Sequence, residues 1–121
     1  MKLLVLLSTF AMLATSAFAD GPVHHVVMFK FKPDADKASV EKVETEFAKL
    51  KDKVPGITSL EWGTNSSPEK LSKGFTHIWI VTFKDEAARD VYLTHPAHLA
   101  FVEVLKPVLV EPMVIDFVPK K

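Results

Sequence analysis

The sequence contains no cysteine. The fold therefore has no disulfide to stabilise it, and an N-terminal cysteine modified by lipid is excluded. Without a thiol, the chain has few groups besides histidine and tyrosine that can move protons near neutral pH. Any chemistry in this protein is therefore expected to depend on these two residue types.

The sequence also lacks an excess of charge of either sign. Its 15 Lys and Arg residues balance its 15 Asp and Glu residues. Proteins that bind nucleic acid present a basic surface to the phosphate backbone. Nucleic acid is therefore not expected as a partner.

The first 19 residues are typical of a secretory signal peptide. Lys2 supplies a positive start, an apolar run of about eleven residues follows, and Ala17-Phe18-Ala19 forms a small-x-small cleavage site. A transmembrane helix needs about 20 apolar residues, which disfavours the alternative of a membrane anchor. We expect cleavage after Ala19, a short extension over residues 20–23, and a secreted or periplasmic domain over residues 24–118. No membrane partner is expected after cleavage.

The rest of the chain predicts alternating strands and helices. Apolar residues spaced by three and four positions indicate helices, and strict alternation indicates strands. Asp36 and Asp85 are suitable N-caps. The predicted elements are strand 24–32, helix 36–53, strand 57–64, strand 75–84, a helix from Asp85 to about Leu93, a helix from Pro96 to about Leu105, and strand 111–118. This βαββααβ order predicts an α+β sandwich of the ferredoxin-like type.

Two of the predicted strands are apolar on both faces. In strand 75–84, Trp79 and Val81 point one way, and Ile78 and Ile80 point the other. The helices of one chain cover one face of the sheet, so the second apolar face needs another cover. An identical sheet from a second protomer would provide it, giving a homodimeric α/β barrel that encloses space.

One segment places a phenol and two imidazoles within seven residues, at Tyr92, His95 and His98. An imidazole can act as general base toward a carbon acid, while a phenol hydrogen-bonds the developing enolate oxygen. Tyr92 and His98 are therefore a candidate catalytic pair. The alternative is that Tyr92 packs against helix 36–53 and His98 bonds a loop carbonyl. The residues leave both interpretations open.

A metal site is a further alternative. His95 and His98 are three positions apart, and His25 and His77 lie on predicted strands, so four imidazoles are available for zinc or copper. His95, however, precedes its helix, and no carboxylate is placed to complete the site. We therefore predict no metal and no other cofactor.

Several short segments, in this order along the chain, together resemble the stress-responsive A/B barrel family, a set of small dimeric α+β barrel proteins. The segments are His25–Lys32, Trp62–Asn65, Ser67–Glu69, Gly74–His77, Tyr92–His98 and Val114–Phe117. The resemblance implies aldol-type ring closure by Tyr92 and His98, with His25 and His77 in the pocket. The signal peptide is a departure from the cyclase known in that family, because the thioester-linked polyketides on which such a cyclase acts are held in the cytoplasm.

Together these observations predict an enclosed pocket that binds a small, mostly apolar molecule with one or two oxygen atoms. Its predicted apolar lining is Phe29, Trp79 and Phe101, and its predicted polar contacts are His25, His77, Tyr92 and His98. The first hypothesis is a binding protein without catalysis. The second is a small lyase or cyclase that uses Tyr92 and His98. The third, by analogy of fold alone, is a monooxygenase that acts on haem or aromatic compounds.

Overall fold

The computed structural model describes residues 21–121, so the predicted signal peptide and its cleavage site lie outside the described residues. Along the chain the elements are β1 (Val23–Phe31), α1 (Lys37–Ala48), α2 (Leu50–Lys53), β2 (Ile57–Thr64), β3 (His77–Phe83), α3 (Glu86–Thr94), α4 (Pro96–Leu105), the 3-10 turn η1 (Lys106–Val108) and β4 (Leu109–Phe117). No helix within residues 21–121 has both the length and the apolar character needed to cross a bilayer.

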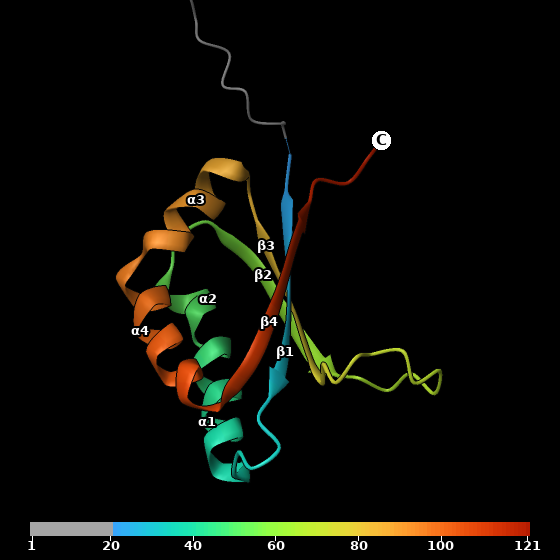
Figure 1. Cartoon of the computed structure of the whole chain (residues 1–121). Coiled ribbons are helices and arrows are strands. Elements are labelled where there is room, and N and C mark those ends of the chain that lie inside the picture. The colour runs from blue at the N-terminus through green and yellow to red at the C-terminus, as the bar shows by residue number, and fades with distance from the viewer. Residues whose placement is uncertain (1–20) are drawn as a thin grey trace, which may run out of the picture.

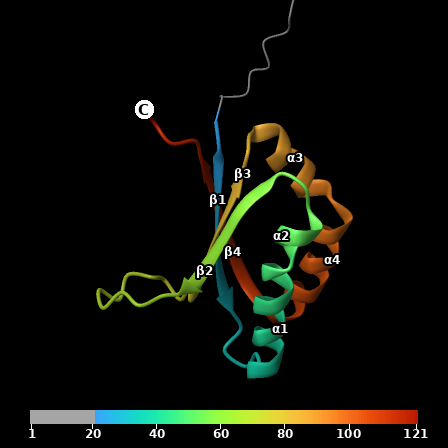
Figure 2. The same cartoon turned by 180° about the vertical axis from the view of Figure 1, so that it is seen from behind.

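The four strands form one antiparallel sheet in the order β2-β3-β1-β4. All the helices lie on one face of this sheet (Figure 1), and the view from behind shows the same two layers (Figure 2). The predicted ferredoxin-like α+β fold is therefore confirmed. β4 is an edge strand of this sheet and pairs with β1. It can therefore contain Pro112, because the proline nitrogen has no hydrogen to donate and an edge strand has no neighbour on its other side.

The predicted helix 36–53 is interrupted at Lys49, which separates α1 from α2. The interruption is slight, because Lys49 keeps right-handed helical backbone angles and its N–H still bonds the Thr45 carbonyl. The helical segment ends at Val54, whose backbone is extended. Pro55 follows, and a proline disfavours helical geometry in the residue before it.

Three helix starts are fixed by side-chain caps. The carboxylates of Asp36 and Asp85 accept hydrogen bonds from the backbone N–H groups of Ser39 and Ala88, as predicted from the sequence. The third cap is His95, whose Nδ1 accepts from the N–H of Ala97 at 3.0 Å. The caps of α3 and α4 set the position of the turn between these helices, and this turn lies between Tyr92 and His98.

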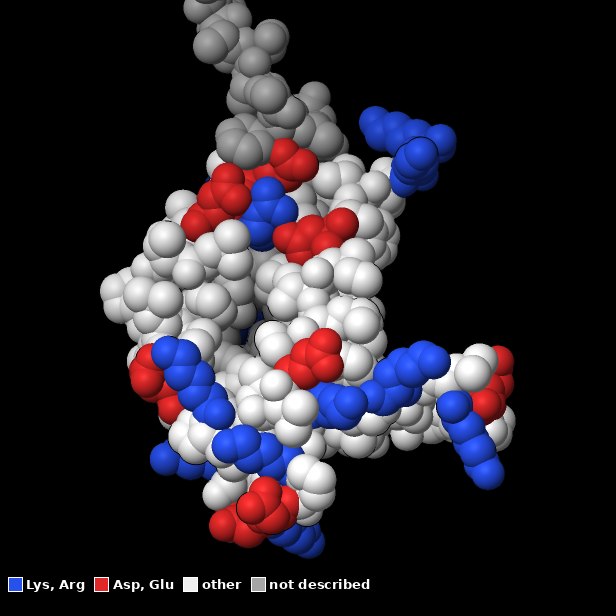
Figure 3. All heavy atoms as spheres, in the orientation of Figure 1, with Lys and Arg blue, Asp and Glu red and all other residues white. Residues whose placement is uncertain are grey.

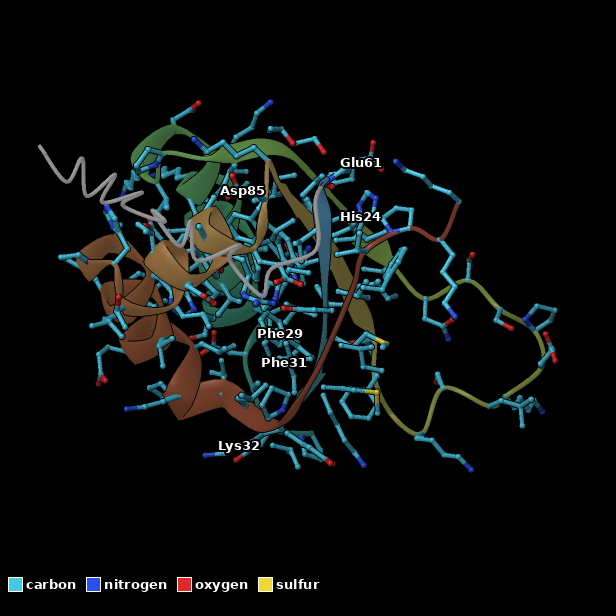
Figure 4. All side chains as sticks on the ribbon, turned by 90° about the horizontal axis from the view of Figure 1, so that it is seen from above. His24, Phe29, Phe31, Lys32, Glu61 and Asp85 are labelled. Carbon is cyan, nitrogen blue, oxygen red and sulfur yellow. The ribbon has the colours of Figure 1, made fainter. Side chains whose placement is uncertain are left out.

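The core lies between the helices and the sheet. Phe29, Trp79 and Phe83 on the strands are almost completely buried. Trp79 stacks on Phe47 of α1 with ring centroids 4.1 Å apart and planes 3° from parallel. Phe29 points to the helical side of β1, whereas His24 points to the other side (Figure 4).

The face of the sheet opposite the helices is largely apolar and uncovered. The apolar residues of this open face are Val26, Met28, Ile78, Ile80, Met113, Ile115 and Phe117, and its polar residues include His24, Glu61 and Thr82. Its exposure is greatest on β4, where Ile115 is 54% exposed and Phe117 50% exposed. The loop over residues 65–74 extends on this same side of the sheet in both views (Figures 1 and 2).

Candidate functional site

A cavity of about 230 Å³ lies between α3 and α4 on one side and strands β1 and β4 on the other. Figure 3 shows the surface hollowed between the helical side and the sheet. Most of the lining is apolar. The lining residues are His25, Val27, Phe29, Phe47, Tyr92, Leu93, His98, Phe101, Val102, Leu105, Lys106, Leu109, Pro112 and Val114.

Tyr92 and His98 meet at this cavity. Tyr92 is near the end of α3 and His98 is in the first turn of α4, and their ring centroids are 4.3 Å apart. Burial raises the pKa of Tyr92, because a phenolate would lose its hydration in this apolar setting. The phenol therefore keeps its proton at neutral pH and can donate a hydrogen bond.

His98 is oriented by a backbone carbonyl. Its Nδ1 donates to the oxygen of Leu93 at 3.2 Å, which leaves Nε2 with a free lone pair in the neutral ring. Burial lowers the pKa of His98, and the nearby His25 lowers it further, against the opposing effect of the Leu93 hydrogen bond. The ring is therefore neutral near pH 7, and its Nε2 can accept a proton or a hydrogen bond.

His25 reaches the same cavity from β1. It is 4% exposed, and its ring centroid lies 5.6 Å from that of Tyr92. Its Nδ1 lies 2.6 Å from Oδ1 of Asp116 on β4. The other oxygen of Asp116 accepts from Nη1 of Arg89 on α3 at 2.8 Å.

Three polar atoms of the lining residues have no hydrogen-bond partner in the part of the chain that the structure describes: the Tyr92 hydroxyl oxygen, Nε2 of His98 and Nε2 of His25. Within residues 21–121, Trp79 Nε1 is the one side-chain nitrogen or oxygen that is both sealed off and unpartnered. Because the three cavity atoms are not sealed, they face open space. The cavity thus has a polar end formed by Tyr92, His98 and His25, and the rest of its lining is apolar except for Lys106.

The structure brings five of the seven predicted site residues to this cavity, namely His25, Phe29, Tyr92, His98 and Phe101. It does not bring His77 and Trp79 there, because both are on β3 and face α1, whereas the cavity lies over β1 and β4.

His77 is surrounded by partners of its own. Its Nε2 lies 2.8 Å from a carboxylate oxygen of Glu44, and its Nδ1 lies 2.8 Å from the Thr76 hydroxyl. Its ring meets that of Phe31 edge-on at 4.9 Å. Both ring nitrogens are engaged, as in a structural core histidine.

His95 serves as a helix cap, because its Nδ1 accepts a hydrogen bond from the N–H of Ala97. Within residues 21–121, no three His, Asp or Glu side chains are close enough to hold a metal ion. The geometry therefore assigns His95 to the fold of the α3–α4 turn.

Arg89 and Asp116 were not predicted as site residues. Asp116 faces the helical side of the sheet and bonds His25. Strand alternation contained the signal, because Met113, Ile115 and Phe117 on one face place Val114 and Asp116 on the other. Arg89 gave no comparable signal, since its partner is distant in the sequence.

Comparison with known proteins gives a family match and close relatives. The model of the family described as Stress responsive A/B Barrel Domain matches residues 23–119. The Arabidopsis thaliana stress-response A/B barrel domain-containing protein HS1 is 34% identical over 84% of this chain and 93% of its own length. Olivetolic acid cyclase from Cannabis sativa is 28% identical over 82% of this chain and 98% of its own length.

Solved structures share the fold. Hydroxynitrile lyase from Passiflora edulis has a TM-score of 0.78 at 22% identity, covering 85% of this chain and 97% of its own. A protein from Jannaschia sp. CCS1, described as a dimeric ferredoxin-like protein of unknown function, has a TM-score of 0.72 at 24% identity. It covers 82% of this chain and 100% of its own. At these identities the likeness is one of fold.

Proposed function

The chain belongs to the stress-responsive A/B barrel domain family, and from this premise we propose that it binds a small, mostly apolar molecule in the cavity under α3 and α4. The molecule carries one or two oxygen atoms, which lie at the polar end near Tyr92 and His98. The apolar part of the molecule packs against Phe29, Phe101 and Leu105.

The observation that carries this proposal is the group of three polar atoms that have no hydrogen-bond partner within residues 21–121, in a cavity whose other lining residues are apolar except for Lys106. Because these atoms face open space, water can reach them when the cavity is empty. A ligand that enters displaces this water and supplies the hydrogen-bond partners in its place, while its apolar part is removed from water. The Tyr92 hydroxyl can donate, and the Nε2 atoms of His98 and His25 can accept.

Calorimetric titration with 4-butylphenol tests the proposal, since this probe combines a short apolar chain with one oxygen. We expect saturable binding to the mature protein. Val102→Trp should abolish it, because Val102 lines the cavity and the indole would fill the space. Val91→Trp is the matched control, because Val91 is on α3 but does not line the cavity. Equal binding by both variants would place the probe elsewhere and contradict the proposal.

The functional unit in this proposal is a homodimer formed through the open face. Large side chains such as Ile115 and Phe117 are half exposed on this face. Such a contiguous apolar surface is unusual for a monomer and is typical of an interface. The description of the Jannaschia structure as dimeric supports the formation of a dimer. Two sheets packed face to face would complete the predicted barrel.

Acid–base catalysis in the same cavity is the second candidate function. The contact between the rings of Tyr92 and His98 supports it, together with the 28% identity to a protein named as a cyclase. In this reaction His98 Nε2 removes a proton from the carbon next to a carbonyl, and the Tyr92 hydroxyl hydrogen-bonds the enolate oxygen. The proton returns to the same carbon in a simple exchange.

Hydrogen–deuterium exchange at the methyl group of acetophenone in deuterated water tests this second function. Catalysis by the protein should accelerate the exchange, and His98→Ala should remove the acceleration. His95→Asn is the matched control, because His95 is outside the cavity lining and asparagine keeps a side-chain cap for α4. If His98→Ala accelerates exchange as well as the unaltered protein does, His98 is not the base.

We also propose that the protein is exported from the cytoplasm. The support is the sequence of the first 19 residues, with its positive start, apolar run and Ala17-Phe18-Ala19 site. The binding domain would then meet its ligand outside the cytoplasm, after removal of the signal peptide.

A further inference from the structure

A chain of charged contacts runs from α3 across β4 to β1, next to the cavity. Arg89 donates to Oδ2 of Asp116 at 2.8 Å, and Oδ1 of Asp116 lies 2.6 Å from Nδ1 of His25. All three side chains are largely shielded from solvent, with 19%, 23% and 5% of their side-chain surface exposed. We propose that Asp116 and Arg89 are positioning residues that fix the proton of His25 on Nδ1 and keep its Nε2 as a hydrogen-bond acceptor toward the ligand.

The proton arrangement follows from the donors and acceptors present. A guanidinium is always protonated in proteins, so Arg89 can only donate. An Asp116 carboxylate that pairs with this guanidinium can only accept, through both of its oxygens. The short contact from Asp116 to His25 therefore requires a proton on Nδ1 of His25. In the neutral ring, Nε2 then has a lone pair and no proton.

Arg89 also connects this arrangement to Tyr92. The two residues are three positions apart on α3, so they project from neighbouring points of one helix face. The ion pair with Asp116 holds α3 to the edge strand β4, which pairs with β1 at His25. One network thus sets both the tautomer of His25 and the distance of the Tyr92-bearing helix from the sheet.

This arrangement predicts a property of the ligand, and in this respect it rests on the proposed binding function. His98 also presents an unprotonated Nε2, because its Nδ1 donates to Leu93. Two acceptors therefore face the cavity, beside the single hydroxyl of Tyr92. A molecule with a hydroxyl group can donate to one of these acceptors, whereas its methyl ether cannot. The site should therefore select hydroxyl-bearing molecules.

Nitrogen NMR of histidine-labelled protein tests the tautomer without any ligand. In a neutral imidazole the protonated and the unprotonated ring nitrogens have distinct chemical shifts, so the spectrum shows which of them carries the proton. We expect His25 in the unaltered protein to carry its proton on Nδ1. Asp116→Asn should move a measurable fraction of His25 to the Nε2-protonated form, because an amide can donate to Nδ1.

Asp90→Asn is the matched control, since Asp90 also pairs with Arg89 but does not touch His25, and it should leave the tautomer unchanged. A proton on Nε2 in the unaltered protein would overturn the inference, and this measurement needs no variant to fold. An unchanged tautomer in folded Asp116→Asn would overturn it too.

Ligand selection is measured with 4-butylphenol and 4-butylanisole, in which a methyl group replaces the hydroxyl proton and removes the donor. The unaltered protein should bind the phenol at least about tenfold more tightly than the ether, and Asp116→Asn should lower that ratio about threefold, because His98 still presents one acceptor. Arg89→Met should lower the ratio part of the way, and Arg89→Lys should restore some of it. Equal binding of both probes by the unaltered protein would overturn the predicted selection.

If the unaltered protein binds neither probe, the proposed binding function fails for this class of molecule. The NMR result still decides whether Asp116 fixes the His25 proton. The two failures are therefore distinguishable.

Discussion

Replacing Ile115 by glutamate should abolish association of the protein with itself. Ile115 is 54% exposed on the open face, so a dimer formed there buries about half of its side chain in each protomer. Complete burial of an isoleucine contributes about 1.5–3 kcal/mol. The loss is therefore about 1 kcal/mol for each protomer and about 2 kcal/mol for a symmetric dimer.

The introduced charge adds a larger cost. An unpaired carboxylate in a desolvated interface costs several kcal/mol, and two-fold symmetry introduces two of them. The combined destabilisation should exceed about 4 kcal/mol, which corresponds to a dissociation constant about a thousandfold weaker.

Analytical ultracentrifugation over a range of protein concentrations measures this effect. We expect a dimer for the unaltered protein at micromolar concentration and a monomer for Ile115→Glu. Leu99→Glu is the matched control, because Leu99 is 51% exposed but lies on α4, in the layer away from the open face. Circular dichroism should show the same helix and strand content for all three proteins. A monomeric unaltered protein, or equal dissociation of both variants, would refute the reasoning.

Three further predictions follow from the cavity and the N-terminal segment. Tyr92→Phe should weaken 4-butylphenol binding about two- to tenfold in calorimetry, because it removes one hydrogen bond and leaves the ring packing intact; an unchanged affinity would mean that the hydroxyl does not contact the probe. The lowered pKa of His98 means that the unfolded chain binds more protons than the folded one as pH falls below 6.5. The free energy of unfolding should therefore decrease with falling pH between 6.5 and the lower folded pKa, and urea titrations of His98→Gln should lack this part of the slope; the same slope in the variant would contradict the assignment. Intact mass of protein recovered from the growth medium or periplasm should correspond to a chain beginning at Asp20, and a chain retaining Met1 would contradict cleavage after Ala19.

The sequence predicted the order of helices and strands because the patterns that indicate these elements involve residues close together in the chain. Alternation in β3 and the helix signals at Asp36, Asp85 and Pro96 depend on residues close together in the chain, and the structure has the predicted element order. No local pattern predicted the break at Lys49, because the residues on both sides of Lys49 are good helix formers.

The site was predicted less completely because it depends on contacts between distant segments. His25 and His77 occupy similar positions on apolar strand faces, and no local pattern separates the one that faces α3 and α4 from the one that pairs with Glu44 of α1. Their separation depends on the strand order β2-β3-β1-β4, which places β1 next to β4 and β3 next to β2. The link between Arg89 and Asp116 likewise requires the position of α3 above the edge strand.

The most direct test of the account is methyl NMR during titration with 4-butylphenol. Binding in the cavity should shift the methyl signals of Val102, Leu105 and Val114, which line it, and should leave those of Val91 on the outer side of α3 unchanged. His98→Ala should weaken the same shifts without moving them to other residues. Shifts confined to Ile80 and Ile115 on the open face, or no shifts at saturating probe, would contradict the claim that this cavity is the functional site.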